Sequence, residues 1–124
     1  MKPVEPIDTV ELFPPLSQEL VSLLKTLQPN EWARPTVCTP WTVKDVAAHL
    51  LGGNLGRLWD RSKGLDPIEK SSLSYDELLS LINNDNAQWV QAARRISPEI
   101  LVEFLVLTDR CLYDLFRNLD PYEP

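Results

Sequence analysis

The single histidine of this 124-residue chain, His49, is the side chain best suited to bind a metal or to transfer a proton. Three of the four glycines, Gly52, Gly53 and Gly56, follow it within seven residues. On a helix these glycines lie on the same flank as the imidazole. Such a strip without side chains either admits another helix at close range or leaves room for a ligand. The structural alternative is a half-buried histidine hydrogen-bonded to a neighbouring carbonyl, with glycines for close helix packing.

One histidine is a weak indication of a metal site, because such sites usually take three or four protein ligands. The sequence contains no His-x-x-x-His or Glu-x-x-His spacing.

Trp32 and Trp41 precede the helix of His49 and are too large to leave in water, so we expect them to pin a loop onto the helices. Trp41 borders that helix and is also expected, with Gly52, Gly53 and Gly56, to line a ligand pocket.

The predicted helix that carries His49 has a clear start. Thr42 precedes an apolar-periodic run and Asp45 follows three residues later, which is a capping-box pattern. Apolar residues then recur at helical spacing. They are Val43, Val46, Ala47, Leu50, Leu51, Leu55, Leu58 and Trp59. The period keeps its phase across the glycines, so we expect one helix to about Ser62, and a break at Gly52–Gly53 is the alternative.

Three further segments have helical periodicity. They are residues 14–27, 75–95 and 98–119. Serine or proline stands at the predicted starts, as is common for first turns. The stretch from residue 28 to residue 41 and the stretch over residues 64–72 are expected to be loops. We therefore predict an all-α fold, with a single domain over residues 1–124 built as an antiparallel four-helix bundle.

The last predicted helix carries more apolar surface than one core contact needs. Its expected core stripe consists of Ile100, Leu101, Phe104, Leu105, Cys111, Leu112, Leu115 and Phe116. Val102, Val106 and Tyr113 form a second row on another side. A helix at the edge of a small domain needs one apolar stripe. We therefore expect a partner subunit, in a homodimer, or an additional stretch of sequence to cover this second row.

The composition excludes several classes of partner. The net charge is −6, the pI is about 4.7, and the only basic cluster is the pair Arg94–Arg95, so nucleic acid is not expected to bind. No apolar run reaches 18 residues and no signal peptide is recognised, so we expect a cytoplasmic protein without a membrane partner. Cys38 and Cys111 are expected to be reduced thiols, one in a loop and one on a helix.

The segment from Pro35 to Gly53, PTVCTPWTVKDVAAHLLGG, resembles the signature of the mycothiol-dependent maleylpyruvate isomerase N-terminal domain, within the DinB/YfiT-like superfamily. Residues 8–27 and 96–121 are similar to that domain as well. The resemblance implies a DinB-like four-helix bundle that holds a divalent metal, zinc or nickel. His49 matches the first metal ligand of the family. A low-molecular-weight thiol such as mycothiol or bacillithiol is the usual co-substrate, and it acts on a small-molecule electrophile.

The resemblance also implies that the metal site is incomplete in this sequence. The family's other ligands are an acidic residue and a histidine four residues later, on a helix that would follow Pro124. We expect a truncated piece of a longer domain or a short relative without the metal site. Three functions follow: a metal- and thiol-dependent isomerase or S-transferase scaffold, a non-catalytic bundle that self-associates through the uncovered face of its last helix, and a metal-free small-molecule-binding module.

Overall fold

The computed structural model describes residues 9–38, 40–63 and 74–118, with the side chains of residues 59–63 left aside. Within these ranges the chain forms a short 3-10 helix and five α-helices, and no strand. The helices are η1 (Val10–Leu12), α1 (Phe13–Lys25), α2 (Pro29–Trp32), α3 (Val43–Lys63), α5 (Tyr75–Ala93) and α6 (Pro98–Arg117). The prediction of an all-α fold is confirmed. The predicted loop over residues 64–72 lies outside the described residues.

α3, α5 and α6 begin where the sequence predicts, because their caps form. At the start of α3 the Asp45 amide donates to the Thr42 hydroxyl at 3.3 Å, and the Thr42 amide donates to the Asp45 carboxylate at 3.1 Å. The hydroxyls of Ser74 and Ser97 cap α5 and α6 in the same way. α3 continues through all three glycines, so the alternative of a break at Gly52–Gly53 is wrong.

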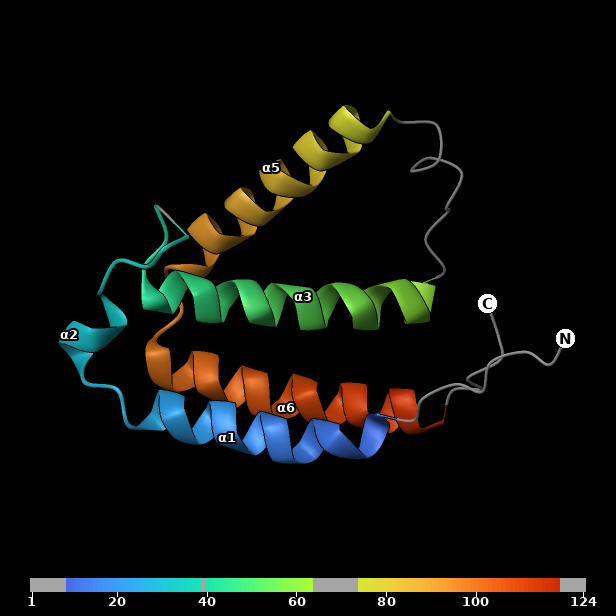
Figure 1. Cartoon of the computed structure of the whole chain (residues 1–124), viewed down its shortest axis with the longest axis horizontal. Coiled ribbons are helices and arrows are strands. Elements are labelled where there is room, and N and C mark those ends of the chain that lie inside the picture. The colour runs from blue at the N-terminus through green and yellow to red at the C-terminus, as the bar shows by residue number, and fades with distance from the viewer. Residues whose placement is uncertain (1–8, 39, 64–73, 119–124) are drawn as a thin grey trace, which may run out of the picture.

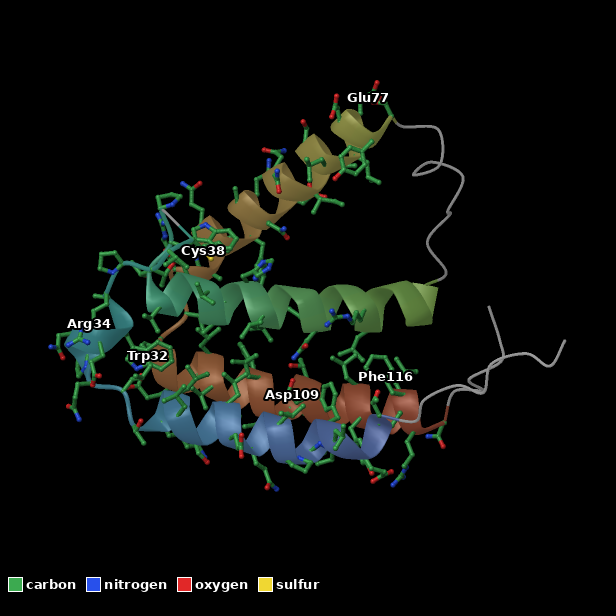
Figure 2. All side chains as sticks on the ribbon, viewed as in Figure 1. Trp32, Arg34, Cys38, Glu77, Asp109 and Phe116 are labelled. Atoms are coloured by element: carbon green, nitrogen blue, oxygen red, sulfur yellow. The ribbon has the colours of Figure 1, made fainter. Side chains whose placement is uncertain are left out.

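The segment between α1 and α3 contains a short helix, α2, where only a loop is predicted from the sequence. Pro29 occupies its first turn, and the Gln28 amide donates to the Glu31 carboxylate at 2.9 Å, which closes a capping box. Trp32 at its end is buried in the core cluster, as expected for a residue that pins this segment. Figure 2 shows Trp32 where α2 meets the body of the protein.

The long helices are arranged around α6. α1 and α3 both pack on α6, and α5 packs on the far side of α3 (Figure 1). α1 runs antiparallel to α3 and α6. The buried core is aliphatic, with one tryptophan. It comprises Val21, Leu24, Trp32, Ala47, Ala48, Leu51, Ala93, Leu101, Val102 and Leu105.

The second apolar row predicted on the last helix is covered by the chain itself. The expectation that a partner subunit or further sequence must cover it is wrong. Val102 is only 6% exposed, Val106 packs against the core, and the Tyr113 hydroxyl donates to the Glu11 carboxylate at 2.9 Å. α6 does expose an apolar row, but on another side. This row consists of Ile100 and Phe104, which are predicted to lie in the core, and Leu107. The error arises because α1 packs on the side of α6 that the pattern leaves open.

Among the described residues, α5 is buried against the rest of the protein near its C-terminal end. Val90 and Ala93 are buried, whereas Tyr75, Leu79 and Ile82 are exposed. In Figure 1 the start of α5 diverges from α3, and Figure 2 shows Glu77 at that free end. The described structure is therefore a packed group of three helices with a fourth long helix attached at one end.

Candidate functional site

His49 lies on the side of α3 that faces α1, at the edge of a small cavity. The cavity has a volume of about 170 Å³ and is lined from three helices. Its lining residues are Leu20 of α1, His49, Leu50, Gly53, Asn54 and Arg57 of α3, and Leu105 and Asp109 of α6. We call this place the α1–α3 groove. Both walls rest on α6, so the groove's floor is formed by α6.

The imidazole of His49 is half-buried and packs against Trp41. The two ring centroids lie 5.0 Å apart at an interplanar angle of 38°. Trp41 is held in turn by its own backbone, since its amide donates to the Cys38 carbonyl at 2.9 Å and its carbonyl accepts from the Thr36 hydroxyl at 2.8 Å. Among the described residues, the imidazole of His49 has no hydrogen-bond partner. The carbonyl partner required by the structural alternative is therefore not found in that part of the chain.

A polar network forms part of the groove's floor. Asn54, which is 7% exposed, donates from Nδ2 to the Thr108 hydroxyl at 3.0 Å and to the Asp109 carboxylate at 2.8 Å. The Ser17 hydroxyl donates to the other oxygen of Asp109 at 2.5 Å. Figure 2 shows Asp109 on the side of α6 that faces α3. These hydrogen bonds join α1, α3 and α6, and they satisfy polar groups that would otherwise be costly to bury.

Arg57 places a positive charge on the rim of the groove. Its side chain is exposed, and its Nη1 lies 3.8 Å from the position that a Cβ on Gly53 would occupy. The guanidinium group thus extends back along α3 toward Gly53 and His49. Within the described ranges Arg57 forms no ion pair. It is therefore available to an anionic group that enters the groove.

The three glycines predicted to line one pocket have three different environments. A Cβ on Gly52 would lie 2.6 Å from both Cδ1 and Nε1 of Trp89, so Gly52 admits α5 and does not line the cavity. Gly53 lines the cavity, whereas a Cβ on Gly56 would meet nothing within 4 Å. Trp41 contacts His49 without lining the cavity itself.

The described residues do not by themselves fit the divalent metal that the family resemblance implies. No group of three or more His, Cys, Asp or Glu side chains lies together in the part of the chain that the structure describes. Asp109 shares the groove with His49, but both of its carboxylate oxygens already accept hydrogen bonds. Cys38 and Cys111 are free thiols, as expected, but Cys111 is exposed although it is predicted to lie in the core stripe of the last helix. Of the described residues that line the groove, His49 offers an imidazole with no hydrogen-bond partner among the described residues.

A second polar cluster closes the N-terminal end of α3, away from the groove. Asp45 is buried and forms an ion pair with Arg94 at 3.3 Å, and the Lys44 ammonium donates to the Arg94 carbonyl at 2.7 Å. Burial raises the pKa of Asp45, but hydrogen bonds from Arg94 and Thr42 and the charge of Arg94 lower it more. The net pKa of this carboxyl therefore lies below its ordinary value.

Three groove residues, Asn54, Arg57 and Asp109, are not predicted from the sequence. Asn54 and Asp109 are polar, whereas periodicity selects apolar positions as facing the core. A signal does exist for Asn54, which lies seven residues after Ala47 and thus on the same buried face. A polar side chain at such a position needs a buried partner. Arg57 carries no comparable signal, because an arginine on a helix is ordinarily solvated.

The all-α fold is consistent with a DinB-like helical domain. The chain belongs to the mycothiol maleylpyruvate isomerase N-terminal domain family, whose family model matches residues 13–124. No curated protein and no solved structure matches the chain. Within the described residues, no helix combines the length and the apolar character needed to cross a bilayer.

Proposed function

We propose that this chain is the scaffold of a metal- and thiol-dependent isomerase or S-transferase, with His49 as one ligand of a divalent zinc or nickel ion. The observation that carries the proposal is the position of His49. Its imidazole lies at a 170 Å³ cavity and has no hydrogen-bond partner among the described residues. Membership of the mycothiol maleylpyruvate isomerase family supports the thiol as co-substrate.

The remaining metal ligands in this proposal lie outside the described residues. A bound divalent ion would supply stabilisation of a thiolate. The chain's own part is to bind and orient the reactants. Arg57 would pair with an anionic group of the thiol or substrate, and Leu20 and Leu105 would exclude water from the inner part of the groove. A cavity of this size suits a ligand portion about as large as benzene.

Metal titration by isothermal calorimetry tests this proposal. Zn²⁺ and Ni²⁺ are expected to bind the wild-type chain and to lose most of their affinity in His49→Ala. Gly56→Ala is the matched control, because it lies on the same flank of α3 but meets nothing within 4 Å. Binding that is absent from the wild type, or unchanged in His49→Ala, would contradict the proposal for this chain.

A second candidate function is a non-catalytic bundle that self-associates. The observation in its favour is the apolar surface that the described helices leave exposed, on η1 and α1 as well as on α6. The residues concerned are Leu12, Leu16, Leu23, Ile100, Phe104 and Leu107. Surfaces of this kind are typical of association sites when they are contiguous. The test is the mass of the protein in solution by light scattering, and a monomer would rule this function out.

A further inference from the structure

A second cavity lies at the end of the molecule where α2, the start of α3, the C-terminal end of α5 and the start of α6 meet (Figure 1). Its volume is about 380 Å³, more than twice the 170 Å³ of the cavity in the α1–α3 groove. Ligand pockets in proteins span roughly 300–1,000 Å³, so this cavity is large enough to take a small organic molecule. We call it the α2–α6 cavity.

Part of the lining of the α2–α6 cavity is apolar and rigid. It is formed by Pro29, Trp32, Ala33 and Pro98. Pro29 and Pro98 stand in the first turns of α2 and α6, where the proline ring fixes the backbone angle φ. Trp32 is buried in the core cluster and is therefore held in place. Such a surface suits an apolar group, and little order has to be imposed on it when a ligand binds.

The rest of the lining presents positive charge to the solvent. Asp45 and Arg94 form an ion pair, but the Asp45 side chain is 5% exposed and the Arg94 side chain is 55% exposed. The cation of this pair is thus the accessible partner. Lys44, which is half-buried, adds a second positive charge. Asp45 is the one acid among the described residues that line the cavity, so their net charge is positive.

Both cations have more hydrogen-bond donors than their contacts with Asp45 and the backbone use. Arg94 donates to Asp45 from Nε and Nη2, each at 3.3 Å, and Nη1 takes no part in either bond. The Lys44 ammonium donates to the Arg94 carbonyl at 2.7 Å, and an ammonium group has three donors. A guanidinium group and an ammonium group at one cavity are suited to bind a carboxylate.

We propose that the α2–α6 cavity binds a small carboxylate that carries an apolar ring. The carboxylate accepts hydrogen bonds from Arg94 and Lys44, and the ring packs against Pro29, Trp32 and Pro98. The apolar lining favours such a molecule over an inorganic anion, which would gain the charged contacts alone. This site is separate from the α1–α3 groove and does not rest on a metal at His49.

Isothermal calorimetry with benzoate at constant ionic strength tests the proposal. The wild-type chain is expected to bind benzoate with a dissociation constant on the order of 1 mM, as for other ligands of this size. Acetate lacks the ring and benzyl alcohol lacks the charge, so each is expected to bind at least about tenfold more weakly. A chain that does not bind benzoate, or that binds acetate as tightly, would overturn the proposal.

Substitution of Lys44 tests the charged contact. Lys44→Gln is expected to weaken benzoate binding about tenfold, because a charge-assisted hydrogen bond is lost. Lys44→Arg keeps the charge and is expected to retain the affinity within about threefold. The matched control is Arg95→Gln, since Arg95 is exposed and does not line the cavity. An unchanged affinity in Lys44→Gln, or an equal loss in Arg95→Gln, would overturn the proposal.

Two-dimensional NMR spectra locate the bound benzoate. The indole N–H of Trp32 and the side chain of Arg94 are expected to shift, while the amides of Gly53 and Asp109, which line the α1–α3 groove, stay in place. Shifts at Gly53 and Asp109 without a shift at Trp32 would place benzoate in the groove and overturn the proposal. A chain that binds benzoate in the α2–α6 cavity but no Zn²⁺ would contradict the metal site alone, and the converse would contradict this site alone.

Discussion

α3 has two sides next to its contact with α6, one facing α5 and one facing the α1–α3 groove. Side chains on the α5 side have contacts within the protein that those on the groove side lack. On the α5 side, the indole of Trp89 covers Gly52 at a distance that excludes any Cβ, and its Nε1 donates to the Ala48 carbonyl at 2.7 Å. On the groove side, the side chains of His49 and Arg57 have no hydrogen-bond or ion-pair partner among the described residues. The two neighbouring glycines therefore have different roles: Gly52 lets α5 pack closely on α3, whereas Gly53 lines the cavity.

This difference separates structure from function along one helix. A residue whose contacts are already satisfied within the protein contributes to stability, and its replacement lowers the free energy of unfolding. A polar residue at a cavity with no internal partner can take its partner from a ligand. We therefore expect substitutions on the α5 side to change the free energy of unfolding, and substitutions at His49 and Arg57 to change binding.

Gly52→Ala is expected to give the largest effect. The added Cβ would lie 2.6 Å from two atoms of the Trp89 indole, so Trp89 must shift and its hydrogen bond to Ala48 is lost or weakened. We expect a loss of about 1–3 kcal/mol in the free energy of unfolding, even though alanine favours helix. Urea denaturation measures it. Unchanged or increased stability would show that α5 does not pack on α3 in this way.

Asp45→Asn is expected to follow, because it breaks the ion pair between the buried Asp45 carboxylate and the exposed Arg94 side chain and weakens the cap at Thr42. We expect a loss of about 1–2 kcal/mol at neutral pH. The lowered pKa of Asp45 means that its contribution is present above about pH 4 and is lost as the pH falls further. The difference between wild type and variant should therefore shrink in acid.

The control for Asp45 is Asp85→Asn on α5. Asp85 is exposed and has no hydrogen bond or ion pair within the described ranges, so its replacement should leave the urea midpoint nearly unchanged at either pH. An Asp45→Asn variant with a constant deficit down to strong acid would contradict the assigned direction of the pKa shift.

Gly53→Ala and Gly56→Ala are expected to give the smallest effects, and in the opposite direction from Gly52→Ala. A Cβ at Gly53 would make an ordinary 3.8 Å contact with Arg57, and one at Gly56 would meet nothing within 4 Å. Each substitution should stabilise the protein by up to about 1 kcal/mol, because alanine has the higher helix propensity. Thermal unfolding measures it. Destabilisation at Gly56 would indicate a contact that the described residues do not supply.

Periodicity and caps predicted most of the fold. Thr42 and Ser97 mark helix starts through interactions within one turn, and such local interactions can be read directly from sequence. The exposed side of α6 could not be predicted, because it depends on which side of α6 is covered by α1. The short helix α2 was missed since its capping box uses Gln28, a less usual cap residue.

The candidate site was predicted only in part. The resemblance selected His49, and His49 and Gly53 do lie at one cavity. The sequence could not separate Gly52 from Gly53, because adjacent helical positions differ by about 100° in direction and the neighbouring helix decides which is covered. Asn54 and Asp109 meet only through tertiary packing of α3 on α6. No local pattern connects residues so far apart in the chain.

The most direct test of the difference between the two sides of α3 is one zinc titration followed by two-dimensional amide NMR spectra. We expect the signals of His49, Gly53 and the Arg57 side chain to move as Zn²⁺ is added, while the indole N–H of Trp89 stays in place. In His49→Ala the same additions should move neither the Gly53 signal nor the signal of the Arg57 side chain. Zinc-dependent shifts at Trp89, or a wild-type spectrum that does not change at His49, would contradict the account.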